Sequence, residues 1–416
     1  MPLRFLTAGE SHGKALVAIV EGLPAGLPIS AEWVDRDLGR RMMGYGRGAR
    51  MKIERDKVEW LAGIRAGETL GTPVAMLIPN RDWANWEEVM APEGTPGETR
   101  RRRVTRPRPG HADLVGVLKY DRQDARDILE RASARETTAR VAAGALARRL
   151  LDEFAVEIGS HVVSLGGIRV PPLSPLPVPL NQASDRSEIR VLDPSVEAEI
   201  IRRIDRAKQD GDTLGGEVEV VVRGVVLGLG SHVSWDRKLD ARLAGALMSI
   251  PAVKGVEIGL GFEAAQRPGS QVHDPIDPDA VPGRPAPAPA YRGGFRRRSN
   301  NAGGLEGGMT TGEPLVLLVA MKPISTLMSP LPTVDFTTGL PAKAQSERSD
   351  VTAVPAMGVI AEALVALVLA DAMLEKFGGD SLGEMRRNFD GYLAAMAERW
   401  AALDAANEPV SGAEAR

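Results

Sequence analysis

The segment 359–377 constrains the fold of this chain more than any other feature. Its pattern predicts a helix that is apolar nearly all round, in a 416-residue chain whose overall composition is typical of globular proteins, with 43% hydrophobic residues. Glu362 interrupts the apolar run, and Asp371, Glu375 and Lys376 follow near its end. The segment is therefore predicted to be a buried core helix rather than a membrane span.

The remaining periodicity predicts a mixed α/β chain. Segments rich in Val and Ile predict strands at 15–20, 217–224 and 315–320. Helical patterns occupy 31–43, 124–154, 194–209, 236–249, 355–377 and 382–404. Two proline-rich stretches, 171–179 and 275–289, exclude helix and central strand and are expected to be surface excursions.

Part of the N-terminal half recurs in the second half of the chain. Five residues reappear 202 positions later in the same order: Val20, Gly22, Gly26, Leu27 and Trp33 match Val222, Gly224, Gly228, Leu229 and Trp235. Both copies run from a strand through a glycine-bounded loop into a helix. Chance and an internal pseudo-two-fold repeat are both open, and a real repeat predicts two similar halves in one body.

Composition excludes several classes of protein. The chain has no cysteine, which excludes disulfides, thiolate nucleophiles and cysteine-based metal sites. Lys plus Arg number 52 against 55 for Asp plus Glu, so the net charge of -3 argues against a nucleic-acid or membrane partner. No two of the five histidines have metal-ligand spacing, so no metal is expected. The N-terminus lacks the basic head and long apolar core of a signal peptide, and we expect a cytoplasmic protein.

The motif Gly9-Glu10-Ser11-His12-Gly13 lies between two short apolar runs and predicts a tight bend. Glycine lets the backbone turn sharply there, and an imidazole titrates near neutrality, so His12 is a candidate proton donor or acceptor. The alternative is a turn that carries a solvated histidine. His111 has a similar setting after Gly110, whereas His161, His232 and His273 are expected to be structural or solvated.

Arginine is concentrated in four places. The four sets are Arg40, Arg41, Arg47 and Arg50; residues 100–103 with Arg106 and Arg108; Arg131 and Arg135; and Arg348, two residues before Asp350. Guanidinium groups match carboxylate and phosphate oxygens, so the pattern predicts a pocket for a small, multiply anionic ligand. The alternative, arginines that are solvated or paired with nearby acids, is preferred for 100–103. The glycine-rich segment 303–312 could approach a phosphate or a flat ring, although it fits neither nucleotide-binding fingerprint.

Four signatures in order resemble the chorismate synthase family. They are Gly9 to Gly13, RPRPGHAD at 106–113, ERASARETTARVAAGA at 130–145 and ERSDVTAVP at 347–355, and the resemblance extends over about residues 3–378. It implies loss of phosphate and a ring proton from 5-enolpyruvylshikimate-3-phosphate to give chorismate, an anti-1,4-elimination that requires reduced FMN. It also implies an α/β sandwich, with antiparallel sheets inside and helices outside, formed by a single catalytic domain at 1–378 and followed by a C-terminal helix and frayed tail at 379–416.

The resemblance assigns candidate roles to individual residues. Arg41, Arg47, Arg50, Arg135 and Arg348 would hold substrate anions, although Arg41 and Arg47 could instead contact the nicotinamide nucleotide. His12 would protonate or stabilise the departing phosphate, His111 would lie against the flavin, and Asp350 would accept or relay a proton. Ser11 and Ser133 would support them with hydroxyl groups.

Implied FMN contacts form a second set: Arg131, Ala132, Ser133, Pro251, Ala252, Gly307, Lys322, Pro323, Ile324, Ser325, Thr326 and Arg348. Pro251 has neither a side-chain amide nor a backbone N–H, so it cannot donate a hydrogen bond to a flavin.

The resemblance further implies a homotetramer and a separate flavin reductase that reduces FMN at the expense of NADPH. Two other functions compete with it. An ordinary flavin oxidoreductase would use NADPH for net electron transfer in each turnover. A nucleic-acid-binding protein would use the basic runs at 100–108 and 296–298, but the first of these holds no aromatic residue.

Overall fold

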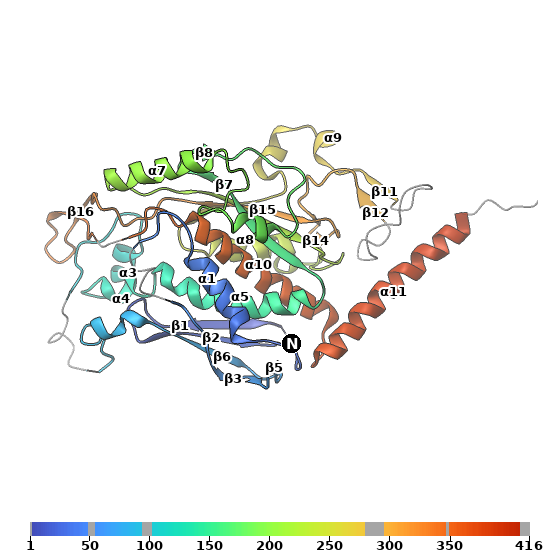
Figure 1. The fold of residues 1–416 in the computed structure, drawn as a ribbon, viewed down its shortest axis with the longest axis horizontal. Coiled ribbons are helices and arrows are strands. Elements are labelled where there is room, and N and C mark those ends of the chain that lie inside the picture. Colours follow the sequence, from blue (N-terminus) through green and yellow to red (C-terminus); the bar gives the residue numbers. More distant parts are fainter. Residues whose placement is uncertain (1, 49–54, 94–101, 279–294, 347–348, 408–416) are drawn as a thin grey trace, which may run out of the picture.

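The computed structural model describes residues 2–48, 55–93, 102–278, 295–346 and 349–407, and two antiparallel sheets enclose a layer of helices (Figure 1). The first sheet has the order β1 (Arg4–Ala8), β2 (Ala15–Glu21), β6 (Val74–Pro79) and β3 (Glu59–Ala62). The second has the order β10 (Val253–Ile258), β15 (Leu315–Met321), β9 (Gly216–Arg223), β7 (Glu157–Leu165) and β8 (Ile168–Arg169).

The helices between the sheets are α1 (Ala31–Met42), α5 (Thr137–Asp152), α8 (Leu239–Met248) and α10 (Val354–Phe377). The longer helices elsewhere are α7 (Glu197–Asp210) and α11 (Leu382–Asn407), and α11 extends away from the layers (Figure 1). Short helices are α3 (Asp113–Lys119), α4 (Arg126–Leu129), α6 (Leu180–Ser184) and α9 (Gly269–Val272).

Four two-stranded ribbons complete the regular structure of the described residues. They pair β4 (Ile64–Arg65) with β5 (Glu68–Thr69), β11 (Ile276–Pro278) with β12 (Phe295–Arg297), β13 (Leu305–Glu306) with β14 (Met309–Thr310), and β16 (Pro332–Val334) with β17 (Pro341–Lys343). Single 3-10 turns lie at Arg81–Asn85, Ala134–Glu136, Trp235–Arg237 and Gly261–Gln266.

Helix α10 occupies the centre of the molecule. In its most apolar 18-residue window 89% of the residues are buried, which confirms the prediction of a core helix. It packs on α5 and on strands β7 and β9, and α5 packs on β2. The approach to α5 is close, because a Cβ added at Gly144 would lie 2.5 Å from the Cβ of Ala363.

The α/β sandwich with antiparallel sheets is confirmed, but its layers are ordered differently from our expectation. We expected sheets inside and helices outside, whereas α5 and α10 lie between the two sheets. The physical reason is in the sequence of α10, which has no polar face to present to water and must be covered on every side.

The internal pseudo-two-fold repeat is confirmed by the topology. The order β1-β2-β6-β3 of the first sheet is repeated as β7-β9-β15-β10 in the second. The loops match in detail: Leu27 donates its N–H to Thr69 Oγ1 over 2.9 Å, and Leu229 donates its N–H to Thr310 Oγ1 over 2.8 Å. A second sequence echo accompanies this match, since Gly63, Gly67, Thr69, Gly71 and Pro73 correspond to Gly304, Gly308, Thr310, Gly312 and Pro314.

Most expected elements are confirmed, with one correction. The helix expected at 124–154 is broken into α4, a 3-10 turn and α5, because residues 130–136 form a loop that enters the site. The proline-rich stretch 171–179 holds no helix or strand. Of the stretch 275–289, residues 276–278 form an outer ribbon, and residues from 279 lie outside the described part of the chain.

Candidate active site

Loops at one end of the helical layer enclose a cavity of about 540 Å³. They come from both halves of the chain, and the lining includes most of the side chains singled out in the sequence. Those residues are Ser11, His12, Arg41, Arg47, His111, Ala132, Ser133, Pro251, Ala252, Lys322, Ile324, Ser325, Thr326 and Asp350. The volume is within the range of small-molecule and cofactor sites.

His12 follows β1 on the predicted glycine-bounded bend. Gly9 has φ +105°, and a Cβ there would lie 2.4 Å from the carbonyl oxygen of Ala15, so only glycine fits. The imidazole Nδ1 lies 2.9 Å from Glu130 Oε2, and the His12 side chain is 15% exposed. This contradicts the alternative of a solvated histidine on a turn.

Glu130 is buried behind His12 and remains ionised. Burial opposes its negative charge, but hydrogen bonds and charge from His12, with further attraction from Arg126, lower the pKa of Glu130. The ring of His12 is thus held between the cavity and a fixed carboxylate.

His111 has a similar carboxylate partner. Its Nδ1 lies 2.5 Å from Asp113 Oδ1, and Asp113 also accepts from Arg108 Nε over 2.9 Å. Burial opposes the charge of Asp113, but the hydrogen bonds from His111 and Arg108 lower its pKa well below the usual range. The His111 loop is tied to the loop after β15, because Lys322 Nζ donates to the carbonyl oxygen of Gly110 over 2.6 Å.

Three arginines lie close together, two of them in the cavity wall. Arg135 Nη1 donates to Asp56 Oδ1 over 2.6 Å, and Arg47 Nε lies 3.3 Å from Asp350 Oδ2. Arg41 is buried, and its Nη1 lies 3.9 Å from Asp56 Oδ2. Within the described ranges, no hydrogen-bond partner reaches this Nη1 atom.

The surroundings of Arg41 disfavour its positive charge. Burial and the repulsion of Arg47 and Arg135, beyond the attraction of Asp56, lower the pKa of Arg41 to about 9. Arg41 stays charged at neutral pH, so the arrangement favours the entry of an anion.

The two candidate serines contact each other. Ser133 Oγ donates to Ser11 Oγ over 3.1 Å and also accepts from the N–H of Arg135 over 3.3 Å. This contact links the His12 bend to the loop before α5.

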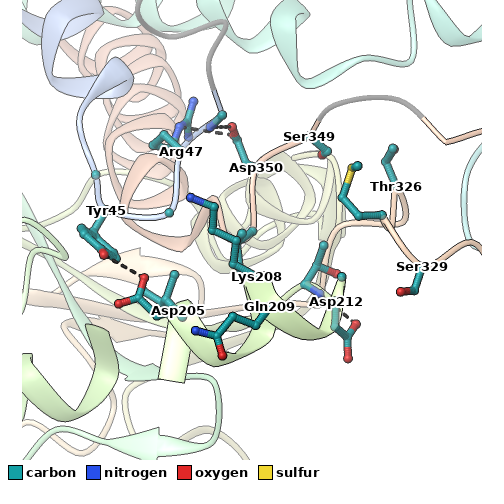
Figure 2. A pocket seen from close by; sticks show the side chains of 18 residues that line it. Tyr45, Arg47, Asp205, Lys208, Gln209, Asp212, Thr326, Ser329, Ser349 and Asp350 are labelled. Carbon is teal, nitrogen blue, oxygen red and sulfur yellow. Dashed lines mark hydrogen bonds and ion pairs between the residues drawn. The ribbon is translucent and has the colours of Figure 1, made fainter. Parts of the chain in front are cut away.

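A second cavity of about 890 Å³ adjoins the first and shares Arg47, Thr326, Ser349 and Asp350 with it. Figure 2 shows Arg47 and Asp350 pointing toward each other on its upper side, with Lys208 of α7 below them. Tyr45 closes another part of the wall by donating its hydroxyl to Asp205 over 2.8 Å. The two histidines line the smaller cavity, which we take as the chemical centre.

Some candidates do not line the smaller cavity. Arg131 turns away and donates to the carbonyl oxygens of Thr7 and Gly9, over 2.8 and 3.1 Å. Gly307 lies on the turn between β13 and β14, and Pro323 is likewise absent from the described lining. Arg135 lies behind the lining, held by Asp56 and Asn80. Two further candidates, Arg50 and Arg348, lie outside the described residues.

Sequence reasoning missed three residues that build the site, and it named Arg108 only as a member of an arginine set. Asp113 and Glu130 stand inside the quoted signatures, so their adjacency to His111 and Ser133 was the available signal. Asp56 carried no such signal, because only folding brings it to Arg135.

The basic run at 296–298 is partly neutralised within the chain. Arg297 Nη2 lies 2.6 Å from Glu306 Oε2, and Arg298 Nη2 lies 2.8 Å from Asp277 Oδ1. These pairs do not favour a nucleic-acid surface there. Across the described residues, no group of three or more His, Asp or Glu side chains could hold a metal ion.

The chain is similar throughout its length to known proteins. Residues 3–374 match the model of the family described as chorismate synthase. The chain is 57% identical to a chorismate synthase of Geobacter sulfurreducens, over 94% of this chain and 98% of that protein. It is 58% identical to one of Trichlorobacter lovleyi, over 95% of this chain and 99% of that protein. A crystal structure of a chorismate synthase superposes with a TM-score of 0.74 at 43% identity, covering 95% of this chain and 98% of that one.

Proposed function

The chain belongs to the chorismate synthase family, whose members are lyases of aromatic amino acid biosynthesis, and on that premise we propose that it converts 5-enolpyruvylshikimate-3-phosphate to chorismate and phosphate. The observation that carries the proposal is Arg41 in the cavity wall, whose buried Nη1 atom has no hydrogen-bond partner among the described residues. A substrate with two carboxylates and a phosphate would supply an anion to this atom.

Substrate binding is assigned to the arginine cluster. Arg41 and Arg47 line the cavity and would contact substrate oxygens directly, with Arg135 contributing from behind. Arg50 and Arg348 keep the same role as a prediction from the resemblance. We assign Arg41 and Arg47 to substrate rather than to a nicotinamide nucleotide because they lie beside His12 in the smaller cavity.

The elimination needs one proton donor and one proton acceptor. The C–O bond to phosphate breaks with its electron pair on the departing oxygen, a ring C–H bond breaks, and its electrons enter the new double bond. His12 would donate a proton to the departing phosphate. Asp350, which lines the same cavity, would accept or relay the ring proton, and Ser11 and Ser133 would orient the phosphate.

The cavity suits reduced FMN beside the substrate. Leu129, Met321 and Ile360 give it apolar wall, while Lys322, Ser325 and Thr326 give polar groups along one strand end. Lys322, Ile324, Ser325 and Thr326, with Ala132, Ser133, Pro251 and Ala252, would hold the cofactor, and His111 would lie against its ring. When bound, reduced FMN supplies an electron-rich ring next to the substrate without net electron transfer. Arg131, Gly307 and Pro323 remain candidate contacts from the resemblance alone.

The resemblance also supports a homotetramer, a separate reductase that supplies FMNH2 at the expense of NADPH, and a cytoplasmic location. The outer face of the first sheet offers a candidate subunit contact, because Leu6 is 67% exposed and Ile19 is 37% exposed there.

We further propose that residues 1–378 are the catalytic unit and that the segment from 379 is an appendage.

Phosphate release under anaerobic conditions tests the proposal. With substrate and chemically reduced FMN, but no NADPH, the protein should release one phosphate per chorismate. An ordinary flavin oxidoreductase would instead need a stoichiometric electron donor in every turnover.

The Asp350→Asn variant tests the assignment of the proton acceptor. Asn keeps the shape of the side chain but cannot take a proton, so FMN and substrate should bind while elimination falls by roughly 10²–10⁴-fold. Preserved turnover would leave Asp350 a structural role, in which it pairs with Arg47 and accepts the backbone N–H of Gly48.

A further inference from the structure

The carboxylate behind His12 is satisfied by three donors. Glu130 Oε2 accepts the backbone N–H of His12 over 2.8 Å, and Glu130 Oε1 accepts from Arg126 Nη1 over 2.8 Å. The His12 Nδ1 atom lies 3.0 Å from Oε1 and 2.9 Å from Oε2. The Glu130 side chain is 2% exposed, so water does not compete for these oxygens.

This geometry requires a carboxylate. Each oxygen of Glu130 faces a donor that cannot become an acceptor, namely a backbone N–H on one side and a guanidinium on the other. An amide at this position would turn its NH2 group toward one of them. The same carboxylate determines the tautomer of His12, because Nδ1 lies beside two acceptor oxygens and must carry a proton.

The ring plane of His12 is fixed by a second contact. Its centroid lies 3.9 Å from that of Trp86, with an interplanar angle of 30°. Trp86 is itself anchored, since its Nε1 donates to Asp82 over 2.9 Å and the Arg126 guanidinium lies 5.0 Å from its ring centroid. Arg126 thus contacts both groups that hold His12.

We propose that Glu130 is the positioning residue for His12. It keeps Nδ1 protonated and orients the ring, so that the proton exchanged with the departing phosphate is carried by Nε2. The inference rests on the proposed role of His12 in phosphate release.

The chain offers a matched control. His161 Nε2 lies 3.0 Å from Glu219 Oε1, across strands β7 and β9, and neither residue lines the cavity. Glu219→Gln therefore removes a carboxylate from a histidine pair of similar length that has no part in the proposed chemistry.

The kinetic test compares Glu130→Gln in two backgrounds under anaerobic conditions with reduced FMN. In the otherwise unchanged enzyme we expect kcat to fall about 10–100-fold with KM changed less than about threefold. Added to His12→Ala, the same substitution should cause no further loss, because its effect passes through His12. Glu219→Gln should keep the kcat of the unchanged enzyme. Near-normal kcat in Glu130→Gln, or an equal loss in both backgrounds, would overturn the proposal.

A second measurement does not depend on turnover. In protein labelled with ¹⁵N-histidine, Nδ1 of His12 should show the shift of a protonated nitrogen, identified by its loss in His12→Ala. Glu130→Gln should move that signal, and Glu219→Gln should leave it in place. An unprotonated Nδ1 in the unchanged protein, or an unmoved signal in Glu130→Gln, would overturn the proposal even if the enzyme is active. If neither the unchanged protein nor any variant catalyses the elimination, but the Nδ1 signals are as expected, the proposed reaction is refuted. The positioning of His12 by Glu130 would then still be supported.

Discussion

Arg40 and Arg41 are neighbours on α1, yet they enter two buried clusters of opposite character. Arg40 Nη1 donates to Glu362 Oε2 over 2.9 Å in the middle of the helical layer. Arg41 faces the cavity, where its Nη1 atom lies 3.9 Å from Asp56 Oδ2. Other arginines nearby repel its positive charge. The acids of the Arg40 cluster lie within the described residues, whereas we propose that a bound anion completes the surroundings of Arg41.

The Arg40 cluster is centred on Glu362. Its carboxylate, which is 0% exposed, accepts from Arg40, Arg148 and Arg190 and from the polar side chains of Ser160 and Asn181. Burial opposes the charge of Glu362, but the three guanidinium groups outweigh it and lower its pKa well below the usual range. Asp37 and Asp185 pair with the same arginines, so acids and bases match.

The difference between the clusters separates structure from function. Buried arginines with matching acids join α1, α5 and α10, whereas Arg41, whose Nη1 has no hydrogen-bond partner among the described residues, faces the cavity that we propose as the substrate site. Both clusters contain the same residue types, so only their balance of charge distinguishes them.

Glu362→Gln should destabilise the protein by about 3–5 kcal/mol, because three buried arginines lose the charge that holds them together. Denaturant unfolding measures the free energy. Glu375→Gln, on the same helix but paired with Arg237 and Arg242 near the surface, should cost less than about 1 kcal/mol. Equal losses in the two variants would contradict the special place of the Glu362 cluster.

The contribution of Glu362 should disappear in acid. Its pKa is lowered in the folded state, so its stabilisation is complete above the unfolded pKa of about 4.3 and is lost as pH falls toward the folded value. The difference in unfolding free energy between the unchanged protein and Glu362→Gln should be constant from about pH 8 to 5. It should shrink below about pH 4, and a difference that grows there would reverse the assigned sign.

Arg41→Met should separate stability from binding. The free energy of unfolding should change by less than about 1 kcal/mol, because repulsion is relieved and Thr137 Oγ1 still donates to the carbonyl oxygen of Ala134 over 2.6 Å. Substrate binding should weaken by about 1.5–3 kcal/mol, or roughly ten- to a hundredfold. Calorimetric titration gives the affinity, and unchanged substrate affinity would remove Arg41 from the binding site.

Inorganic phosphate should stabilise the protein through the surroundings of Arg41. At ten times its dissociation constant it adds about 1.4 kcal/mol, which raises Tm by a few degrees. Glu362→Gln should keep this shift and Arg41→Met should lose most of it. Chloride at equal ionic strength is the control, and the same shift with chloride would indicate screening rather than a bound anion.

Many side chains that line the cavity were named from the sequence, some from local signals and others from the resemblance. His12 and His111 stand on glycine-marked loops, and Arg41, Arg47 and Asp350 accompany them around the cavity. The carboxylate partner of His12 was not predicted, because Glu130 lies 118 residues away along the chain. The spacing of residues in the sequence could not show which arginines would pair with carboxylates in the folded chain.

The fold was predicted to a similar extent. The apolar pattern of 359–377 identified a core helix, and the echo between Val20 and Val222 identified the repeat that the two sheets share. The order of the layers was wrong, because amphipathic patterns report that a face is buried without reporting what covers it. The break before Thr137 was also missed, since the helical pattern of α4 continues into that of α5.

By itself the sequence determined the core helix, the glycine-marked turns, the repeat and the stock of arginines and histidines from which the site is made. These follow from periodicity and backbone freedom, which act over a few residues. The tertiary structure alone decided that Arg40 meets Glu362 while Arg41 meets the cavity, and that Glu130 stands behind His12. Charge balance in a buried site depends on distances between residues far apart in the chain, and only the packed fold sets those distances.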